Sequence, residues 1–497
     1  MLRKLTLWFL ALVLTLTAAS ALAGTYTLAG FDGEDSTNVW ESNGFFTRME
    51  EDTGISFTFQ EYTSYTEWTK AKAAMFAEGG EMPDVLFKAA LTEEEQYTLS
   101  ESGQLIDLLP LLEEYAPDLW AILQANPDYL QAITLPNGKV VALPLITEQS
   151  TQDAIWINQT WLDALGLEMP TDWESLHTVL VAFRDKDPNG NGQKDEIPLA
   201  FLGPWELKFF SHGYGVVAND YNLYLDEAGQ VHYWPSEDSF VELAKTLHSY
   251  WEEGLLDSNG FTTADSLRQV TDSSADMTYG ILLGPTPVNL LPYQSAEQYV
   301  VMTPLTWEGK QVYRELIGDV TGGTFAITSK CENPGELLSW VNRLYTEEGA
   351  ITAMVGREGT DYVVDPNGSW SYVMEATEVS GGNLSVYDTG VMPWYFPLNF
   401  YRNYTEKGIG RISTELEKLR QYLVQPFPQV MLVGENRQKA LELQNQLGAY
   451  VDVTFAQMII GDLEINDETV TAFRQELKNR GMEEMVALWQ GIADGLN

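Results

Sequence analysis

The segment ISFTFQEYTSYTEWTKAKAAMFAEGGEMPDVLF (residues 55–87) contains two strand patterns separated by a helix pattern. Apolar and polar residues alternate over Ile55–Phe59, whereas Trp68–Glu78 has helical character and ends at a pair of glycines. Asp84–Phe87 is a short apolar run that is typical of a buried strand, and Tyr26–Gly30 is a similar short strand upstream. A strand, helix and strand at this spacing predict an α/β fold with a parallel, helix-flanked sheet.

The chain is long enough for more than one domain. Its 497 residues are 44% hydrophobic, which allows sizeable cores in about two to four domains. The single cysteine, Cys331, excludes an intrachain disulfide. The stability of the folded chain must therefore come from packed cores, and a bound ion is a second candidate source of stability.

Residues 1–23 have the composition of a secretory signal peptide. Arg3 and Lys4 form a basic start, and the apolar run Leu5–Leu16 is too short to span a membrane. Leu22-Ala23-Gly24 would suit a lipoprotein signal if a cysteine followed, but the next residue is Thr25. We therefore expect a secreted protein, extracellular or periplasmic, without a lipid anchor of its own.

The charge balance restricts the ligand. Lys and Arg number 28 against 72 Asp and Glu, and the expected signal peptide carries two of the basic residues, which leaves 26 against 72 and a charge of −46. Such a charge repels nucleic acids, anionic membranes and polyanionic sugars. A neutral or cationic ligand is the better expectation.

The segment DKDPNGNGQKDE (residues 185–196) has the pattern of a calcium loop, because oxygen-bearing side chains recur between turn-forming residues. In one register, Asp185, Asp187 and Asn189 occupy positions 1, 3 and 5, with Gly190 at the turn and Glu196 closing the loop. In a second register the ligands are Asp187, Asn189, Asn191, Gln193, Asp195 and Glu196. A third interpretation is an acidic surface turn without a metal. The residues alone leave these alternatives open.

A helix is expected immediately before this loop. Thr171 is the predicted N-cap, with Glu174 at the reciprocal capping position. An apolar stripe follows at helical spacing, formed by Trp173, Leu176, Val179, Leu180 and Phe183. The residues after Glu196 have the pattern of a short extended segment and not of a second helix. A calcium-sensing pair of helices is therefore not expected, and a structural ion is.

Several ordered motifs resemble the extracellular solute-binding proteins of bacterial carbohydrate ABC importers, in the lipoprotein-like subgroup that includes alginate-oligosaccharide binders. The resemblance covers nearly the whole mature chain. It rests on Glu81–Val85, Leu135–Pro144, Trp161–Leu167 with Pro170–Trp173, Asp187–Pro198, Gly323–Thr328, Asn333–Gly349 and Gly356–Tyr362. The sequence departs from that subgroup at the missing lipobox cysteine.

The resemblance implies a two-lobed, periplasmic-binding-protein-like fold of type II, with hinge crossings between the lobes. We expect residues 24–147 plus 320–355 in the N-terminal lobe and residues 148–319 plus 356–497 in the C-terminal lobe. The protein would then be a monomer that captures a carbohydrate, expected to be a neutral oligosaccharide, between its lobes. It would deliver this ligand to ABC transporter permease subunits, through which alone it would meet the membrane. The resemblance also implies Ca²⁺ in the second register, with Asp185 outside the ligand set.

A sugar site needs flat aromatic platforms for C–H faces and a few fixed polar groups for hydroxyls. Aromatic residues on expected interface loops are therefore candidates, and Pro393–Pro397 displays three rings between two prolines. Polar candidates follow expected strands or lie at the first crossing. The predicted contacts are Asp32, Trp40, Tyr62, Lys88, Glu148, Trp205, Trp234, Trp307, Trp394 and Tyr395. For Lys88 a surface ion pair is the alternative interpretation.

Two other classes of protein compete with an importer component. A secreted glycosidase or lyase would need a suitable pair of carboxyl groups, and no pair among the 72 acidic residues is singled out. The four histidines lack a metal-ligand spacing, and neither a nucleophile elbow nor a phosphate loop is present. A polysaccharide adhesin without transport is the other alternative. The expectation is a binding protein without enzymatic activity.

Overall fold

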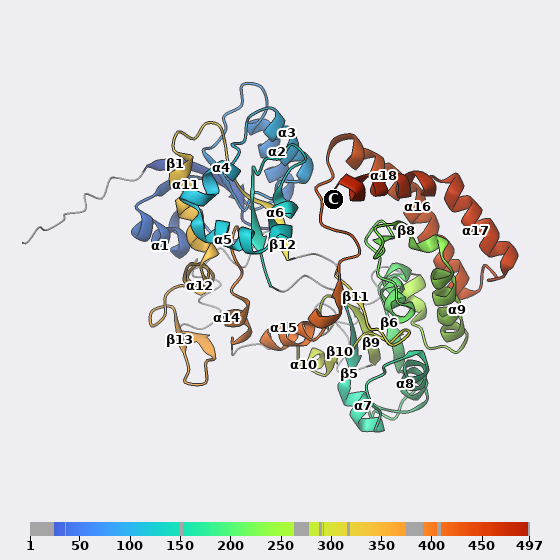
Figure 1. Cartoon of the computed structure of the whole chain (residues 1–497). Helices are drawn as coiled ribbons and strands as arrows, with labels where there is room; N and C mark the ends of the chain where they lie inside the picture. Colours follow the sequence, from blue (N-terminus) through green and yellow to red (C-terminus); the bar gives the residue numbers. More distant parts are fainter. Residues whose placement is uncertain are drawn as a thin grey trace, which may run out of the picture.

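The computed structural model describes residues 24–34, 36–148, 153–262, 278–287, 291, 293–315, 319–373, 391–404 and 409–495. The predicted signal peptide lies outside these residues. Two groups of elements are evident in Figure 1, each built around its own sheet. We call them the N-lobe and the C-lobe. Within the described ranges, no helix is both long and apolar enough to cross a bilayer.

The N-lobe sheet has five strands in the order β2-β1-β3-β12-β4. β1 pairs in parallel with β2 and β3, and β12 runs antiparallel to β3 and β4. The bounds are β1 Thr25–Phe31, β2 Ser56–Tyr62, β3 Val85–Phe87, β4 Leu143–Ile146 and β12 Val320–Ile327. The strand, helix and strand predicted in residues 55–87 are confirmed. β12, which comes much later in the sequence, lies beside β3 in the same sheet.

Both faces of this sheet are covered, because its side chains alternate. Leu28 and Phe87 belong to one hydrophobic core, whereas Ala29 and Leu86 belong to a second core on the opposite face. α2 and α3 contribute to the second core, and most other helices of the lobe contribute to the first. The helices are η1 Trp40–Ser42, α1 Gly44–Thr53, α2 Tyr65–Met75, α3 Glu93–Glu101, α4 Leu109–Tyr115, α5 Pro117–Ala125, α6 Pro127–Ile133, α11 Pro334–Asn342, η7 Arg343–Tyr345, α12 Glu347–Val355 and α14 Leu398–Arg402.

The C-lobe has one large core around a four-stranded sheet in the order β10-β5-β9-β6. β9 pairs antiparallel with β5 and parallel with β6, and β10 runs antiparallel to β5. Its strands are β5 Ala154–Asn158, β6 Ile197–Ala200, β9 Tyr279–Gly284 and β10 Tyr299–Val301, with smaller pairs of β7 Leu223–Leu225 with β8 Val231–Tyr233 and β11 Tyr313–Arg314 with β15 Leu423–Val424.

Long C-terminal helices complete the C-lobe (Figure 1). α16 packs against α9 and contributes buried residues such as Leu447 and Val451 to the C-lobe core. The helices are α7 Gln159–Leu165, α8 Trp173–Asp185, η2 Pro204–Tyr214, η3 Trp234–Ser236, α9 Asp238–Glu252, η4 Ser258–Phe261, α10 Tyr293–Ala296, α15 Ile409–Glu417, η8 Arg420–Tyr422, α16 Gly434–Ile460, α17 Asp467–Asn479 and α18 Met482–Gly495.

The segment after α12 corrects the predicted lobe boundary at residue 355. Tyr362, Trp370, Met392 and Trp394 pack in the first N-lobe core. The hairpin of β13 Tyr362–Val364 and β14 Trp370–Tyr372 therefore belongs with the N-lobe, as does α14. The aromatic richness of this segment explains the difference, since its rings contact one another and are buried with the N-lobe core.

Among the described residues, the chain changes from one lobe core to the other at three places, which we call passages. The passages run from Ile146 to Ala154, from Tyr313 to Val320 and from Tyr404 to Ile412. The backbone N–H of Thr147 donates to the carbonyl of Asp319 at 2.9 Å, so the first two passages lie side by side at the N-lobe.

Gly323 is part of β12 and has an unusual backbone conformation. Its φ is 75°, and an added Cβ would lie 2.2 Å from the carbonyl oxygen of Leu91. The register of β12 against β4 shifts between Thr321 and Phe325, as at a bulge. Glycine is therefore required here by backbone conformation and by close packing.

Candidate ligand-binding site

A cavity of about 270 Å³ lies in the C-lobe, and we call it the C-lobe pocket. Its walls combine aromatic rings, amides and five charged side chains. The lining residues are Asp153, Trp205, Lys208, Phe209, Ser211, Ala218, Asn219, Asp220, Asn222, Trp234, Tyr313, Arg314, Gln444, Gly448 and Asp452. Asp153 lies at the end of the first passage between the lobes and Arg314 at the start of the second, so the pocket lies beside both passages.

The helix η2 supplies the aromatic platform of this pocket. Trp205 is 46% exposed, and its ring meets that of Phe209 edge to face, with centroids 5.8 Å apart. Pro204 begins the helix with its φ already fixed, and the buried carboxylate of Glu206 accepts the N–H of Leu202 at 2.6 Å. The turn that displays Trp205 is therefore anchored from inside.

Both cations of the C-lobe pocket have carboxylate partners. Lys208 Nζ lies 2.8 Å from Asp452 Oδ1, and the guanidinium of Arg314 pairs with Asp220. Asp153 is half-buried, and burial raises the pKa of its carboxyl, with the Asp220 charge adding to the effect and Arg314 opposing it. The pocket thus combines hydrogen-bond acceptors with cations whose charge is already compensated.

Burial also perturbs Glu206 behind the platform. Loss of solvent is the main cause that raises the pKa of this carboxyl to about 7, with the Asp153 charge adding and the N–H donor of Leu202 opposing. A carboxyl with this pKa changes its charge near neutral pH.

The polar loop after α8 folds around its own oxygens. Asp187 accepts the N–H groups of Asn191 at 3.1 Å and Gly192 at 2.9 Å, and Asn191 Oδ1 accepts the N–H of Gln193 at 2.7 Å. The side-chain amide of Asn191 donates to Asp195. Gly190 and Gly192 have φ of 72° and 76°, which glycine adopts without strain.

Glu196 provides the test of whether this loop suits a cation. Both of its carboxylate oxygens are buried, and neither has a hydrogen-bond partner among the described residues. Burial is the main cause that raises the pKa of this carboxyl, and the charges of Asp195 and Asp187 contribute. A buried carboxylate without a hydrogen-bond partner, as in Glu196, fits a hard cation. The carboxylates of Asp187 and Asp195 accept hydrogen bonds from the loop instead.

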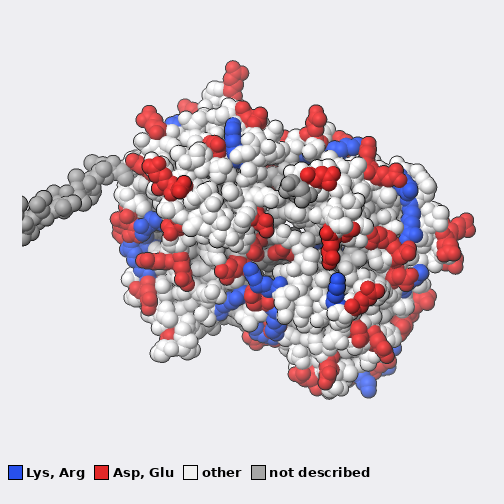
Figure 2. Space-filling view, in the orientation of Figure 1, with Lys and Arg blue, Asp and Glu red and all other residues white. Residues whose placement is uncertain are grey.

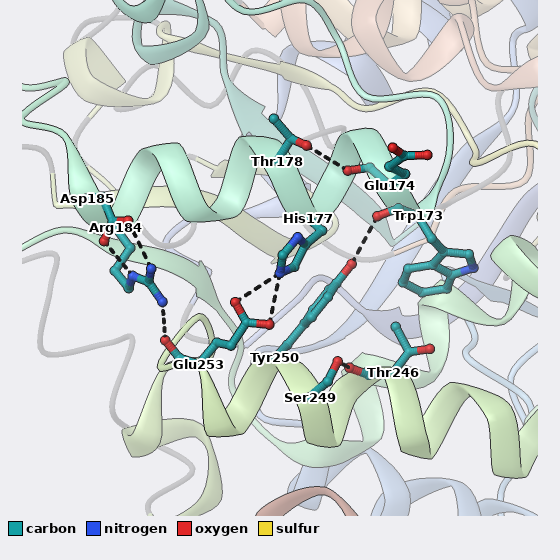
Figure 3. A network of polar contacts seen from close by, with 10 residues as sticks. All are labelled: Trp173, Glu174, His177, Thr178, Arg184, Asp185, Thr246, Ser249, Tyr250 and Glu253. Atoms are coloured by element: carbon teal, nitrogen blue, oxygen red, sulfur yellow. Dashed lines mark hydrogen bonds and ion pairs between the residues drawn. The ribbon is translucent and has the colours of Figure 1, made fainter.

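Asp185 lies apart from this group. Its carboxylate accepts two hydrogen bonds from the guanidinium of Arg184, which also donates to the carbonyl of Glu253 at 2.5 Å (Figure 3). Glu253 in turn holds His177 Nε2 at 2.9 Å. Asp185 therefore takes part in joining α8 to the end of α9. In the described parts of the chain, no cluster of three or more His, Cys, Asp or Glu side chains is arranged to hold a metal.

Comparison with known proteins matches residues 38–351, more than half of the chain, to the bacterial extracellular solute-binding protein family. The chain belongs to this family.

Individual relatives span nearly the whole chain. It is 25% identical over 488 residues to the fructooligosaccharide ABC transporter substrate-binding protein FusA of Streptococcus pneumoniae, covering 90% of this chain and 86% of the relative. An HMO-binding, ABC-transporter-associated solute-binding protein of Bifidobacterium longum infantis has a TM-score of 0.77 at 23% identity, with 95% of this chain and 99% of that chain covered. An EF-hand mutant of FusA in complex with fructo-nystose gives 0.70 at 22% identity and similar coverage of 95% and 99%. The two-lobed fold of this solute-binding protein is thereby confirmed.

Asp32 and Lys88, predicted as ligand contacts of the solute-binding protein, are buried against each other. Lys88 Nζ lies 2.8 Å from Asp32 Oδ1, and neither side chain is exposed. Ser36 Oγ donates to the other oxygen of Asp32 at 2.5 Å. The ends of β1 and β3 meet as expected, but their charges neutralise each other inside the N-lobe. Both predictions of direct contact are corrected.

Three predicted aromatic platforms have other environments. Trp40 and Trp394 are 0% and 3% exposed in the N-lobe core, because neighbouring rings enclose them, and they are corrected to core residues. Tyr62 is half-buried beside Trp68 in the same lobe.

Trp205, Trp234 and Trp307 lie in the C-lobe in different environments. Trp205 and Trp234 both line the C-lobe pocket, although Trp234 is 2% exposed and its Nε1 donates to Ser239. Trp307 is 38% exposed and packs against Tyr214, outside the pocket lining. Only part of the predicted aromatic set is therefore brought together.

Glu148 and Tyr395 are brought together at the first passage. The Tyr395 hydroxyl donates to Glu148 Oε1 at 2.6 Å, and burial, aided by this bond, raises the pKa of the tyrosine. Nearby, the Tyr129 hydroxyl donates to Asp319 at 2.9 Å. These groups form a polar cluster on the N-lobe side of the passages.

Sequence reasoning missed several pocket residues, namely Asp153, Lys208, Phe209, Asp220, Arg314 and Asp452. Lys208 and Phe209 share η2 with Trp205 at helical spacing, and that spacing could have identified them. Arg314 and Asp452 are distant in sequence and belong to no local motif, so folding alone brings them together.

Proposed function

We propose that this solute-binding protein captures a neutral oligosaccharide between its lobes and delivers it to the permease of an ABC importer. Family membership supports the transport role, and the names of FusA and of the Bifidobacterium relative support a carbohydrate ligand. The observation that carries the proposal is the C-lobe pocket, where an exposed Trp205 lies among carboxylates and amides. An aromatic ring covers the C–H face of a sugar, and the polar groups bind its hydroxyls.

Neutrality of the ligand follows from the charges of this pocket. Lys208 and Arg314 are already paired with Asp452 and Asp220, and Asp153 adds a further carboxylate. A uronate or sialic acid would have to displace one of these carboxylates from its cation. A sugar with hydroxyls alone meets acceptors without such a cost.

Isothermal titration calorimetry with a panel of neutral oligosaccharides tests this function. The panel includes fructooligosaccharides and milk-type neutral oligosaccharides, with a uronate-containing oligosaccharide of equal length as control. Saturable binding of a neutral member, with unchanged sugar recovered by chromatography, is expected. Turnover of the sugar would favour a glycosidase or lyase, and binding of long polymers alone would favour an adhesin.

A structural calcium ion is the second part of the proposal. The ligands are Asp187, Asn189, Asn191, Gln193, Asp195 and Glu196, the register that leaves Asp185 with Arg184. Its support is the unpaired, buried carboxylate of Glu196 and the EF-hand named for the FusA relative. When bound, calcium would supply positive charge to Asp187, Asp195 and Glu196.

Secretion as a monomer without its own lipid anchor completes the proposal. The extracellular family and the signal-like residues 1–23 support export. Cell fractionation tests it: we expect processed protein outside the cytoplasm that is released without detergent. Retention in the membrane fraction of cells lacking the permease would contradict the absence of an anchor.

A further inference from the structure

α16 begins at a residue that is unable to cap it. The N-cap residue is Val433, and no side chain of its own segment caps this end. An apolar N-cap leaves the first backbone N–H groups of a helix without the usual side-chain acceptor. At 27 residues, α16 is long and contributes Gln444, Gly448 and Asp452 to the C-lobe pocket.

Two carboxylates of the N-lobe occupy this helix end. Glu94 Oε2 accepts the N–H of Gly434 at 2.9 Å, and Glu93 Oε2 accepts the N–H of Leu432 at 3.1 Å. The guanidinium of Arg437 lies 3.4 Å from the same Glu93 oxygen. Both glutamates belong to the first turn of α3, about 340 residues earlier in the chain. Figure 1 shows the start of α16 beside α3.

Glu93 and Glu94 thus lie between two helix N-termini. The partial positive charge at the start of α3 and that at the start of α16 both favour anions. Burial raises the pKa of the Glu93 carboxyl, with Arg437 and the N–H of Leu432 opposing this effect. The contact is partly buried, since the side chains of Glu93 and Arg437 are 38% and 35% exposed, and its hydrogen bonds are charge-assisted.

The contact of Glu93 and Glu94 with the start of α16 links the N-lobe to the C-lobe at a place away from the three passages of the chain. Met431 packs against the second N-lobe core, whereas the adjacent Leu432 is buried in the C-lobe core. Val430 before this pair and the buried residues of α16 after it pack in the C-lobe core, so this connection is made by N-lobe carboxylates and backbone N–H groups of the C-lobe segment. It adds a non-covalent link to the three passages of the chain.

We propose that Glu93 and Glu94 are positioning residues for ligand capture, which hold the start of α16 from the opposite lobe and so fix the pocket helix relative to the N-lobe. Glu94 caps the first N–H of the helix, and Glu93 binds the preceding Leu432 N–H and the Arg437 side chain. This inference rests on the proposed role of the C-lobe pocket. Neither glutamate lines that pocket. Their effect on binding acts through α16, by holding Gln444 and Asp452 in place when the lobes meet around the ligand.

The test compares wild type with Glu93→Ala/Glu94→Ala and with Glu93→Gln/Glu94→Gln, which keeps acceptor oxygens without the charge. The matched control is Asp467→Asn/Glu468→Gln, because those exposed acids occupy the first turn of α17 within the C-lobe alone. Calorimetry measures affinity for the neutral sugar that wild type binds, and hydrogen exchange measures protection of the amides of residues 432–437.

Loss of both carboxylates should accelerate exchange at residues 432–437 and weaken sugar binding by roughly tenfold, the size of one cap interaction. The glutamine pair should fall between wild type and the alanine pair, and the control should match wild type in both measurements. Unchanged exchange, or an alanine pair that binds sugar as tightly as wild type or tighter, would overturn the inference. If wild type binds no sugar in the panel, the proposed function fails, while exchange still decides whether the cap exists.

Discussion

Lys88 Nζ and Asp32 Oδ1 lie 2.8 Å apart at the ends of β3 and β1, in an ion pair with no exposed side-chain surface. Lys88 also donates to the backbone carbonyl of Asp32 at 3.1 Å and has a φ of 51°, a conformation that non-glycine residues rarely adopt. The pair fixes two loops that leave adjacent parallel strands. Its role is to hold N-lobe loops in place.

Lys88→Met should therefore destabilise the N-lobe strongly. Removing one partner leaves a buried carboxylate without its charge partner, at a cost of about 3–5 kcal/mol. Urea unfolding followed by fluorescence measures this loss. Lys88→Met/Asp32→Leu removes both charges and should recover part of it; a double variant no more stable than the single variant would contradict this explanation.

Trp205→Ala should weaken sugar binding about tenfold, ~1.4 kcal/mol, because it removes the exposed platform of the C-lobe pocket. Trp307→Ala is the matched control, since Trp307 is similarly exposed but lies outside the pocket lining. Calorimetry of both variants with one sugar gives the comparison. Equal losses of sugar affinity in the two variants would show that Trp205 is not a specific platform for the sugar.

Chelation should lower the thermal midpoint of the wild type, and added calcium should restore it. Calcium that binds only the folded chain stabilises it by mass action. Asp187→Ala/Asp195→Ala should abolish the response to calcium, whereas Asp185→Ala should retain it, because Asp185 pairs with Arg184. A wild-type midpoint that is indifferent to chelator, measured by scanning calorimetry, would exclude a structural ion.

Glu206 should contribute a pH dependence of stability. Its pKa is raised from 4.5 to about 7 in the folded chain, so the folded state binds the proton more tightly than the unfolded state. Its contribution to stability is complete below about pH 4.5 and is lost as the pH rises through about 7, by up to about 3 kcal/mol. Glu206→Gln should remove this fall while keeping an acceptor for the N–H of Leu202.

The difference between wild type and Glu206→Gln isolates this group from other titrating carboxyls. Urea unfolding at half-unit steps from pH 5 to 8 gives the two curves. Exposed Glu174→Gln serves as the control substitution. Parallel curves for wild type and Glu206→Gln would show that the charge of Glu206 does not influence folding in this range.

Local patterns predicted much of the N-lobe but not the lobe boundaries. The alternation in Ile55–Phe59 reflects a strand on which Phe57 and Phe59 are half-buried, and the apolar run before Lys88 reflects a fully buried strand, so these elements were predictable. The cap of α8 is displaced by one residue from the prediction: Asp172 and Ser175 form the capping box instead of Thr171 and Glu174. Each of these side chains can cap a helix, and the backbone conformation decides between them.

The pocket and the buried aromatic residues depended on tertiary packing. Trp40 and Trp394 follow loop-like residues in the sequence, and only the meeting of distant rings makes them core residues. The pairing of Arg314 with Asp220 likewise has no local signal. The sequence placed Asp32 and Lys88 after strands, but it did not show that their side chains would form a buried ion pair with each other.

The position of β12 has a consequence for how the protein is assembled during synthesis. This strand lies between β3 and β4, although it is made about 170 residues after β4. Until it emerges, β3 and β4 each present an unpaired edge that could join another chain. The N-lobe core also lacks Trp370 and Trp394 until later still. Protection of these edges before β12 emerges would therefore matter more for this lobe than for the C-terminal helices, whose partners α9 and β8 precede them in the chain.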